Sequence, residues 1–535
     1  MKGFLASAAL VLLAGSVVGL RAADSETFTG TASATGTHKR PLLVVDGKRY
    51  ELKASDKADA KVTEMLEKFS KGDTGTYIVQ GTRGPVNGND GILIDSITAA
   101  TKPSSAPTPP RDVTVVTSFP ADNGPGYKAI PDTQGAVGPN HVVDFDALNF
   151  VVHDKKTGDV LVKKTQQEFW ASVEPVKKLG HNKPWDPRFL YDPNSQRWIA
   201  IMADDGRGYL AVSTSSDPTK PWKGVLLPMP EADLGFKAGV DKNGFYATYA
   251  NPAGRDVHTL HDCIAIPKDD LIAPGGPILT NMSTFQRLEH DSYPATDLNP
   301  NKAPGDPEVI LNKEFGDDCT QLYMYKITWI DKKASISEKQ TIPLSKKYRS
   351  SYTTVEAATA PQPAPGLAIR APRRTISVFQ QGDSVYQCNN AKRTDESNWG
   401  VLWCQVRVSD GKLLQEGLVD DPKCDYLVPA LAVDKDGNIG IGCTRTSATE
   451  FPSVYVMVHG ADDKPGTMRT PVLAVRGTTY YRPAKPTTYG AQFGNYSQTT
   501  IDPSNPNVFW TCQQYSNSTT PDKWCTAWAA FKLSK

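Results

Sequence analysis

Charge of one sign and long apolar helical runs are both scarce in this chain of 535 residues. Its 59 lysines and arginines offset 58 aspartates and glutamates. A balanced chain creates no field that attracts a polyanion, so we expect no nucleic-acid partner. Beyond the first twenty residues no stretch is long and apolar enough to span a bilayer, so we expect no membrane span in the mature protein.

Motifs for several common chemistries are also missing. The chain has no GxSxG elbow, P-loop, HExxH or dinucleotide fingerprint. None of its eight cysteines sits in a CxxC or CxxCH pattern. An even number of cysteines without redox or metal-binding spacing is typical of a disulfide-bonded exported protein.

Residues 1–23 have the pattern of a signal peptide. Lys2 supplies a positive start, an uncharged apolar run extends from Phe4 to Leu20, and two alanines follow Arg21. Because arginine is unusual so close to a cleavage site, an uncleaved anchor is the alternative. We expect a secreted protein, or one located in the periplasm or at the cell surface.

Glycine and proline are abundant, with 42 and 41 copies, which favours an all-β chain of short strands joined by turns. Residues 27–101 predict a small OB-like β-barrel with one helix. The apolar face of that helix is formed by Val62, Met65, Leu66 and Phe69. Residues 102–112 are rich in proline, serine and threonine and predict a linker.

The remaining residues, 113–535, contain a repeated pattern in which an apolar residue precedes a turn. These residues are Val137, Tyr191, Val240, Leu311, Val378, Val433 and Ile501. Small or polar residues precede them at alternate positions, as expected for inner strands that converge on an axis. The spacing accommodates four-stranded units of about 40–50 residues plus loops. We therefore predict a seven-bladed β-propeller, with a pair of β-sandwiches as the alternative.

This register leads to two further expectations. Val113–Ser118 should pair with Trp528–Leu533, which joins the two ends of the ring and removes exposed strand edges. The cysteines should fall on neighbouring strands of the same unit. The predicted cross-strand disulfides are Cys388–Cys404 and Cys512–Cys525, and Cys424–Cys443 and Cys263–Cys319 remain by elimination.

Residues 131–141, 185–193, 429–447 and 494–510 resemble a group of secreted bacterial propeller proteins, and more distantly the sialidase and BNR-repeat class. The resemblance covers roughly residues 120–535 and implies a fold and a compartment, without an established activity. Members usually carry an Arg-Trp-Gly-Asp-Tyr run near the last blade. Here residues 492–496 read Gln-Phe-Gly-Asn-Tyr, so neutral amides replace both charged members.

Charged residues at the starts of the repeats are expected to gather near one end of the axis and form a candidate ligand site. They are Asp132, Asp186, Arg188, Lys237, Glu308 and Arg373. A ligand can bridge such residues, or they can pair with one another and fill the channel. The Asp-box that marks sialidase-like repeats is only approximated, because residues 215–222 lack its glycine.

Asp434, Asp436 and Asn438 alternate along the chain as the oxygen ligands of a calcium loop do. The distal bidentate glutamate of such a loop is missing, and β-turns use the same residue types. We expect a turn here, with Ca²⁺ as the alternative and no other cofactor.

We predict a non-catalytic exported binding or scaffold protein, expected to be a monomer, that presents a propeller face to an extracellular glycan or protein. The alternative is a glycan-acting, sialidase-like hydrolase or lyase with its site at the central channel. Charges that neutralise one another favour the first. An open pocket with an unpaired arginine, aromatic residues and two carboxyl groups about 5 Å apart favours the second.

Overall fold

The computed structural model describes residues 26–534 except 36–39, 46–47, 59, 71–74, 88, 100–111, 126–129, 177–183, 205–206, 230–234, 251–259, 290, 315–317, 351–357, 367, 372–374, 394–397, 484–490 and 518–520. The chain divides into two compact units, Met1–Pro110 and Arg111–Lys535, and the division falls inside the segment predicted as a linker. The predicted signal peptide and Arg373 lie outside the described residues.

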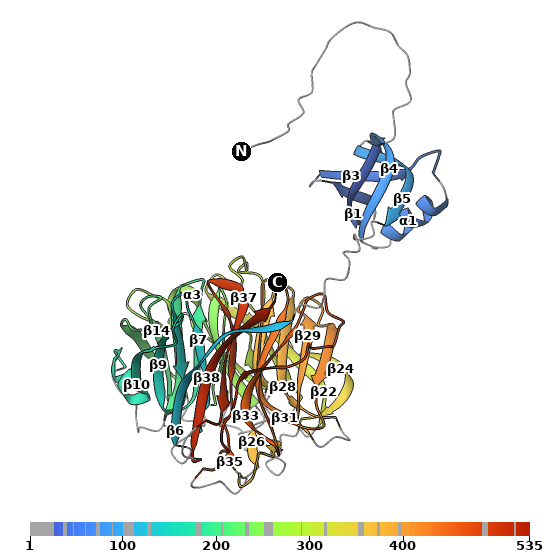
Figure 1. Cartoon of the computed structure of the whole chain (residues 1–535). Coiled ribbons are helices and arrows are strands. Elements are labelled where there is room, and N and C mark those ends of the chain that lie inside the picture. The colour runs from blue at the N-terminus through green and yellow to red at the C-terminus, as the bar shows by residue number, and fades with distance from the viewer. Residues whose placement is uncertain are drawn as a thin grey trace, which may run out of the picture. The chain divides into compact units, whose positions relative to one another are not determined.

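The first unit is a closed five-stranded barrel with one helix (Figure 1). Its elements are β1 (Glu26–Thr35), β2 (Arg40–Val45), β3 (Lys48–Ala54), α1 (Ala60–Ser70), β4 (Gly75–Val86) and β5 (Asn89–Ala99). The strands close in the order β1-β2-β3-β5-β4, and β3 runs parallel to β5. Val62 and Phe69 of α1 are fully buried in the barrel core, against which Met65 and Leu66 also pack, so the predicted helical face is confirmed.

The described part of the second unit contains seven sheets of four or five strands, numbered here in chain order (Figure 1). Sheet 1 has β7 (Gly135–Val137), β8 (His141–Phe145), β9 (Asn149–Asp154) and β10 (Val160–Thr165). Sheet 2 has β12 (Pro184–Asp192), β13 (Arg197–Asp204), β14 (Arg207–Ser213), β15 (Trp222–Leu227) and β11 (Val173–Glu174). Sheet 3 has β16 (Lys237–Val240), β17 (Gly244–Ala250), β18 (Leu260–Pro267) and β19 (Ser283–Glu289). Sheet 4 has β20 (Tyr293–Pro294), β21 (Glu308–Lys313), β22 (Asp318–Ile330), β23 (Lys333–Ile336) and β24 (Gln340–Arg349).

Sheet 5 has β27 (Thr375–Gln381), β28 (Ser384–Ala391), β29 (Gly400–Arg407) and β30 (Leu413–Val419). Sheet 6 has β31 (Asp425–Val433), β32 (Ile439–Ser447), β33 (Glu450–His459) and β34 (Val472–Val475). Sheet 7 has β36 (Gln498–Asp502), β37 (Asn505–Tyr515), β38 (Lys523–Leu533) and β6 (Val113–Pro125). A three-stranded sheet combines β25 (Ala358–Ala360), β26 (Ile369–Ala371) and β35 (Ala491–Gln492), and two short helices are α2 (Gln166–Ala171) and α3 (Lys268–Leu271). No helix in the described ranges is long and apolar enough to cross a membrane.

The first strands of the seven sheets surround a common axis. In the order β7, β12, β16, β20, β27, β31 and β36 each contacts the next, and β36 contacts β7 again. These inner strands are covered on both faces. As a result β31 is buried throughout, and its residues after Asp425 form a continuous apolar run. The outer strand β24 instead alternates between buried and exposed residues. This radial arrangement of small sheets is a β-propeller-like fold.

The ring of sheets is closed by β6, the strand nearest the start of the second unit. It pairs antiparallel with β38, with Ser118 opposite Ala529 and Val113 opposite Leu533. The predicted pairing of the two ends is therefore confirmed. Because β6 completes sheet 7, that sheet combines strands from both ends of the unit.

The predicted inner-strand register is correct for five sheets and wrong for sheet 4, and in sheet 5 Val378 lies on the inner strand but three residues before its end. Val137, Tyr191, Val240, Val433 and Ile501 lie at or next to the ends of inner strands. Leu311, however, lies on β21, because the shorter strand β20 occupies the inner position.

The turn that matches the other repeats in sheet 4 begins at Asp297. Its carboxylate accepts the amide of Asn299, just as Asp241 accepts Asn243 and Asp502 accepts Ser504. The repeat signal in this sheet is therefore Thr296-Asp297 rather than Leu311-Asn312.

The predicted disulfides are not formed, since all eight cysteines are buried free thiols. The strand register explains two of the failures. Cys388 lies opposite Trp403, and Cys404 lies opposite Gln387. A one-residue offset between paired strands points the two thiols to opposite faces of sheet 5. Cys512 and Cys525 lie opposite Trp528 and Tyr515, which separates them by three positions.

Of the other two predicted pairs, one is separated by packing and the other is not. Cys263 and Cys319 belong to the hydrophobic clusters of different sheets. Cys424 and Cys443 share one cluster but remain separate thiols.

We expect the Trp528→Ala variant to lose about 3–5 kcal/mol of unfolding free energy, because Trp528 is fully buried where β38 meets β6 and sheet 1. Urea unfolding measures this loss. Ile330→Ala is the matched control, since Ile330 is 74% exposed and its truncation should leave the midpoint nearly unchanged. Equal midpoints for Trp528→Ala and the wild type would contradict a packed seam.

We also expect peptide mapping without reductant to recover no Cys388–Cys404 or Cys512–Cys525 cross-link, because the register holds each pair apart. Mass spectrometry of alkylated, non-reduced digests provides the measurement. Recovery of either linked peptide in quantity would show that the register of sheet 5 or sheet 7 is wrong.

Candidate functional site

The inner strands begin at one end of the axis, called the starting end here, with an unusual shared backbone conformation. Five residues at the same position of the repeat have positive φ angles: Asp132 (44°), Asp186 (50°), Gly235 (21°), Asp291 (59°) and Val428 (46°). Glycine and aspartate tolerate this region, whereas a β-branched valine is strained there. The conformation recurs in sheets 1, 2, 3, 4 and 6, either just before the inner strand or, for Asp186 and Val428, within its first residues.

Arg188 occupies the centre of the starting end. Its side chain is on β12 of sheet 2, yet its guanidinium lies 3.6 Å from the centroid of the Tyr496 ring beside sheet 7. It also interacts electrostatically with Tyr293 of sheet 4. A side chain that reaches across to both of these sheets lies on the axis. Since Arg188 is only 1% exposed, it plugs the channel at this end.

The hydrogen bonds of this guanidinium are incomplete. Nη1 donates to the carbonyl of Pro187 at 2.7 Å. Among the described residues, Nε and Nη2 have no hydrogen-bond acceptor. Stacking on Tyr496 stabilises the cation but does not use its in-plane N–H donors. Two buried donors therefore remain unsatisfied, which is costly in a protein interior.

Asp132 is the second unusual group at the starting end. Burial, followed by the nearby carboxyl group of Asp186, raises the pKa of Asp132 to about 8, although Arg188 and the Asn495 amide oppose the shift. That amide donates to Asp132 Oδ1 at 3.1 Å. Asp132 therefore holds its proton at neutral pH.

Lys237 is neutralised at the same end by a different partner. Its ammonium group lies 3.1 Å from Asp291 Oδ1, and both side chains are buried. The structure thus brings Asp132, Asp186 and Arg188 together and places Lys237 in a separate ion pair.

Glu308 lies at the opposite end of the axis from the one predicted. It is the first residue of β21, the second strand of sheet 4, which runs antiparallel to the inner strand, so it lies at the end where inner strands finish. The error follows directly from the misassigned repeat of sheet 4. Arg373 lies outside the described residues.

The run Gln492-Phe493-Gly494-Asn495-Tyr496 contributes to the starting end. The Gln492 side chain donates to Asn495 Oδ1 at 3.2 Å, so the two neutral amides pair directly. The backbone N–H of Asn495 donates to Asp132, and the ring of Tyr496 stacks on the guanidinium of Arg188. Tyr293 and Tyr496 are site residues that the candidate set omitted. A correct register for sheet 4 would have placed Tyr293 level with Arg188 and Lys237.

The channel between the two ends is nearly filled. All seven inner strands contribute to its lining, including Ala136, Ala238, Ser377, Leu431 and Thr499, and the enclosed cavity is about 20 Å³. Such a volume holds about one water molecule. This cavity therefore has no room for a sugar.

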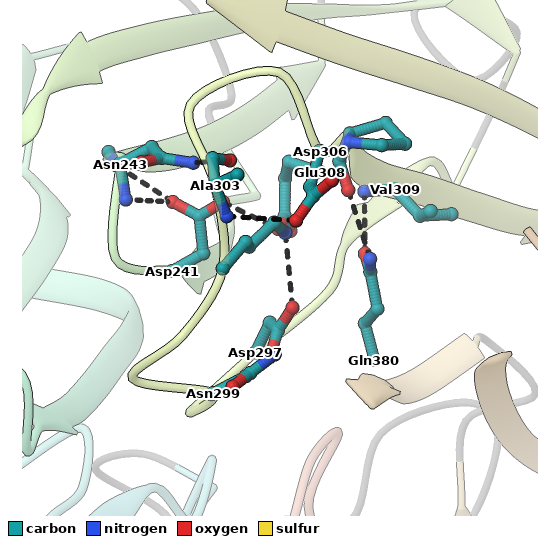
Figure 2. A network of polar contacts seen from close by, with 12 residues as sticks. Asp241, Asn243, Asp297, Asn299, Ala303, Asp306, Glu308, Val309 and Gln380 are labelled. Carbon is teal, nitrogen blue, oxygen red and sulfur yellow. Dashed lines mark hydrogen bonds and ion pairs between the residues drawn. The ribbon is translucent and has the colours of Figure 1, made fainter. Parts of the chain in front are cut away.

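The far end, where the inner strands finish, contains a buried ionic network (Figure 2). Asp241, Asp297 and Glu308 converge on the ammonium group of Lys302 at 2.9, 3.2 and 3.0 Å. All four side chains are at most 2% exposed. Three carboxyl groups therefore face one ammonium in a dry environment.

This imbalance shifts the titration of the network. Burial raises the pKa of Glu308 well above its ordinary value, and Asp241 and Asp297 add to that shift against the opposing effect of Lys302. Burial likewise raises the pKa of Asp297. Glu308 Oε1 also has no hydrogen-bond partner among the described residues.

Similar ion pairs recur between neighbouring sheets. In each, the aspartate that ends an inner strand receives a lysine from the next sheet in the ring. They are Lys155–Asp502, Lys268–Asp192 and Lys302–Asp241. Because the arrangement repeats around the ring, the Lys302 network is best explained as a bridge between sheets 3 and 4 rather than as a reactive lysine.

A polar cleft of about 520 Å³ lies beside this network. Its wall includes Asp297, Lys302, Asp306, Gln380 and Asp383. The Gln380 side chain accepts the Val309 amide at 3.1 Å and donates to the Pro307 carbonyl at 2.9 Å, which ties sheet 5 to sheet 4 (Figure 2). The cleft is large enough for a small ligand but contains no aromatic side chain in its wall.

The possible calcium loop forms a turn whose oxygens already have partners. Asp434 Oδ1 accepts the amides of Asp436 and Asn438, each at 2.9 Å, and Oδ2 accepts the Asn438 side chain at 2.7 Å. Asp436 accepts the side chain of Asn507. Across the described ranges, no group of three or more histidine, cysteine, aspartate or glutamate residues is arranged to hold a metal ion.

No protein-family model and no curated protein matches the chain. Solved structures with a similar arrangement include the Dos1 propeller, at 7% identity over 78% of this chain and 95% of that one, with a TM-score of 0.37. Hsv2 of Kluyvelomyces marxianus matches at 10% identity over 74% and 96%, with a TM-score of 0.32. A Synechocystis apocarotenoid oxygenase mutant matches at 11% identity over 88% and 94%, with a TM-score of 0.37. At these scores the likeness supports no statement about activity.

We expect the Lys302→Met variant to lose about 3–5 kcal/mol of stability, because it removes the cation from a buried cluster of carboxyl groups. The loss should increase with pH, since the raised folded-state pKa of Glu308 means that ionisation destabilises the native state. Urea unfolding at several pH values provides the test. Lys332→Met removes a half-exposed lysine and is the control. An Lys302→Met loss no larger than that of the control would contradict the network.

Proposed function

We propose that this chain is an exported, non-catalytic binding or scaffold protein, formed by an OB-like barrel and a seven-bladed β-propeller. The order β1-β2-β3-β5-β4 with a helix between β3 and β4 supports the OB-like description. The cyclic contacts of the seven inner strands support a propeller with seven blades. Export is inferred from the signal-like residues 1–23.

The observation that carries this proposal is the plugged axis. A propeller enzyme with its site in the central channel needs an opening that admits substrate to its catalytic groups. Here Arg188 is 1% exposed and Asp132 is 5% exposed, and the cavity beyond them holds about one water molecule. Lys237 is already neutralised by Asp291. The charged groups of the axis therefore hold the sheets together, and ligands bind on the loops and clefts of the outer faces.

The ligand class is proposed as an extracellular glycan or protein, bound by a monomer. Propeller faces present many loops on a rigid scaffold, which suits recognition of large partners. The polar cleft beside Lys302, about 520 Å³, is one such surface. Any bound Ca²⁺ at Asp434, Asp436 and Asn438 would have to replace the hydrogen bonds of an existing turn.

A glycan-acting hydrolase or lyase remains the second candidate, because one set of observations favours it. Asp132 keeps its proton near neutral pH and lies close to the carboxyl group of Asp186, as an acid and a base would. Nε and Nη2 of Arg188 beside them have no hydrogen-bond acceptor among the described residues. These are suitable groups for glycoside chemistry, but their burial prevents access in this conformation.

We expect a glycan array probed with the full-length protein to give binding without turnover, because the axis is closed. Every ligand that binds is then incubated with the protein, and its products are analysed by mass spectrometry. Intact ligand is the expected result for the wild type and for Arg407→Ala, a control arginine at the end of the strand β29 with a 39% exposed side chain. Hydrolysis by the wild type and Arg407→Ala but not by Arg188→Ala would overturn the proposal in favour of an enzyme.

A further inference from the structure

Three buried aspartates meet at the seam where the ring is closed, between sheet 7 and sheet 1. Asp122 belongs to the closing strand β6, Asp144 to β8, and Asp146 follows β8 directly. Their exposed fractions are 5%, 0% and 0%. These carboxyl groups have no part in either end of the axis, so their accumulation at the seam requires its own explanation.

Hydrogen bonds connect the three aspartates into one cluster that includes β38. The Thr526 hydroxyl donates to Asp144 Oδ2 at 2.7 Å and accepts the Asp122 amide at 2.9 Å. The Asn149 side chain donates to Asp122 Oδ2 at 2.6 Å. Through these contacts the first strand, the last strand and sheet 1 are joined by side chains as well as by backbone pairing.

Asp146 has one satisfied oxygen and one unsatisfied oxygen. Its Oδ1 accepts the amides of Leu148 and Asn149 at 2.6 and 2.8 Å. Its buried Oδ2 has no hydrogen-bond partner among the described residues. The Asp122 carboxyl group lies close enough to Asp146 to interact with it electrostatically. Two carboxylates cannot donate to each other, so this contact is favourable only when one of them carries a proton.

The charges around the cluster do not balance. Among the described residues, the ammonium group that forms an ion pair with this cluster belongs to Lys163 on β10, which contacts Asp122 Oδ1 and is 48% exposed. The other titratable groups nearby are His153 on β9, Cys512 on β37 and Cys525 on β38. Burial lowers the pKa of His153 and raises the pKa values of both thiols, so these three groups are neutral at pH 7. With all three aspartates ionised, the buried seam would carry a net charge of about −2.

We propose that this seam is a proton-binding latch, in which the closed ring holds at least one proton on the buried pair Asp144 and Asp146, beside Asp122 of the closing strand. Release of that proton places uncompensated charge between β6 and sheet 1 and loosens the closing strand. The site therefore takes a proton as its ligand and couples external pH to the closure of the ring.

The direction of the pH effect follows from the titration of the two innermost groups. Burial, followed by Asp122, raises the pKa of Asp144 to about 7 and that of Asp146 well above its ordinary value. Groups whose pKa is raised in the folded state stabilise that state fully below the unfolded value, near 4. The stabilisation is lost as pH rises through about 7. The latch is thus closed in acid and weakened in mild alkali.

The test compares hydrogen exchange of peptides from β6, residues 113–125, with that of peptides from β29, residues 400–407, in the full-length protein between pH 5.5 and 8.5. Taking the ratio at each pH cancels the intrinsic pH dependence of exchange. We expect the opening equilibrium of β6, relative to that of β29, to increase with pH. The increase should be about tenfold per pH unit for each proton that is released when β6 opens. The thermal midpoint should decrease over the same range.

Two variants should change this dependence in opposite directions. Asp146→Asn should flatten it, because the amide donates permanently where the acid needs a proton. Lys163→Met should steepen it, because ionised aspartates lose their cation. Asp410→Asn, which changes an exposed aspartate in the turn of sheet 5, should match the wild type.

A wild-type β6/β29 ratio that stays constant with pH would overturn the latch. So would equal slopes for the wild type, Asp146→Asn and Lys163→Met. If Asp146→Asn does not fold, Asp144→Asn takes its place. Lys163→Met changes a half-exposed side chain and should fold in either case, so it still shows whether the pH dependence becomes steeper.

Discussion

The pairing of β6 with β38 is the interaction on which the second unit depends. It brings residues 113–125 beside residues 523–533 and so joins the two ends of the unit. Without it, sheet 7 would have three strands and an exposed edge. The seam aspartates also meet through this pairing, since Asp122 lies on β6. Closing so long a chain costs conformational entropy, which the buried Trp524 and Trp528 help to offset.

Buried charge is the second theme of the structure. Lysine–aspartate pairs link neighbouring sheets at the far end, and Arg188 and Lys237 occupy the starting end. Buried ion pairs add little net stability, because desolvation opposes the attraction between the charges. Breaking one is nevertheless costly, so such pairs exclude arrangements in which the sheets are shifted relative to one another. We infer that these charges set the order and height of the sheets around the axis.

Much of the fold was predictable from local patterns. Turn residues after apolar positions identified the inner strands of most sheets, and the apolar helical face of α1 was correct. Sheet 4 failed because its inner strand, β20, is only two residues long. Its turn at Asp297 has the usual aspartate, but the apolar residue expected before it is Thr296. A longer and more apolar segment around Leu311 gave the stronger signal, and it belongs to the second strand.

The candidate site was less predictable, because it depends on contacts between distant segments. Proximity of Asp132, Asp186 and Arg188 followed from their repeat positions, whereas the misassigned sheet placed Glu308 at the wrong end. Disulfide pairing failed for a related reason, since a one-residue difference in register decides which face of a sheet a cysteine occupies. Asp122 lies on the closing strand of sheet 7, Asp144 and Asp146 lie on or directly after β8 of sheet 1, and the three carry no local motif. Only the closed ring shows that they meet.

The most direct test of the account is a cross-link across the closing pair of strands. Ser118 on β6 lies opposite Ala529 on β38, while Ala530 lies opposite Thr117. A protein with Ser118→Cys and Ala529→Cys should form a disulfide between these positions under mild oxidation, and Ser118→Cys with Ala530→Cys should not, because the second pair points to opposite faces. Absence of the first cross-link, or equal formation of both, would contradict a ring closed by β6 in this register.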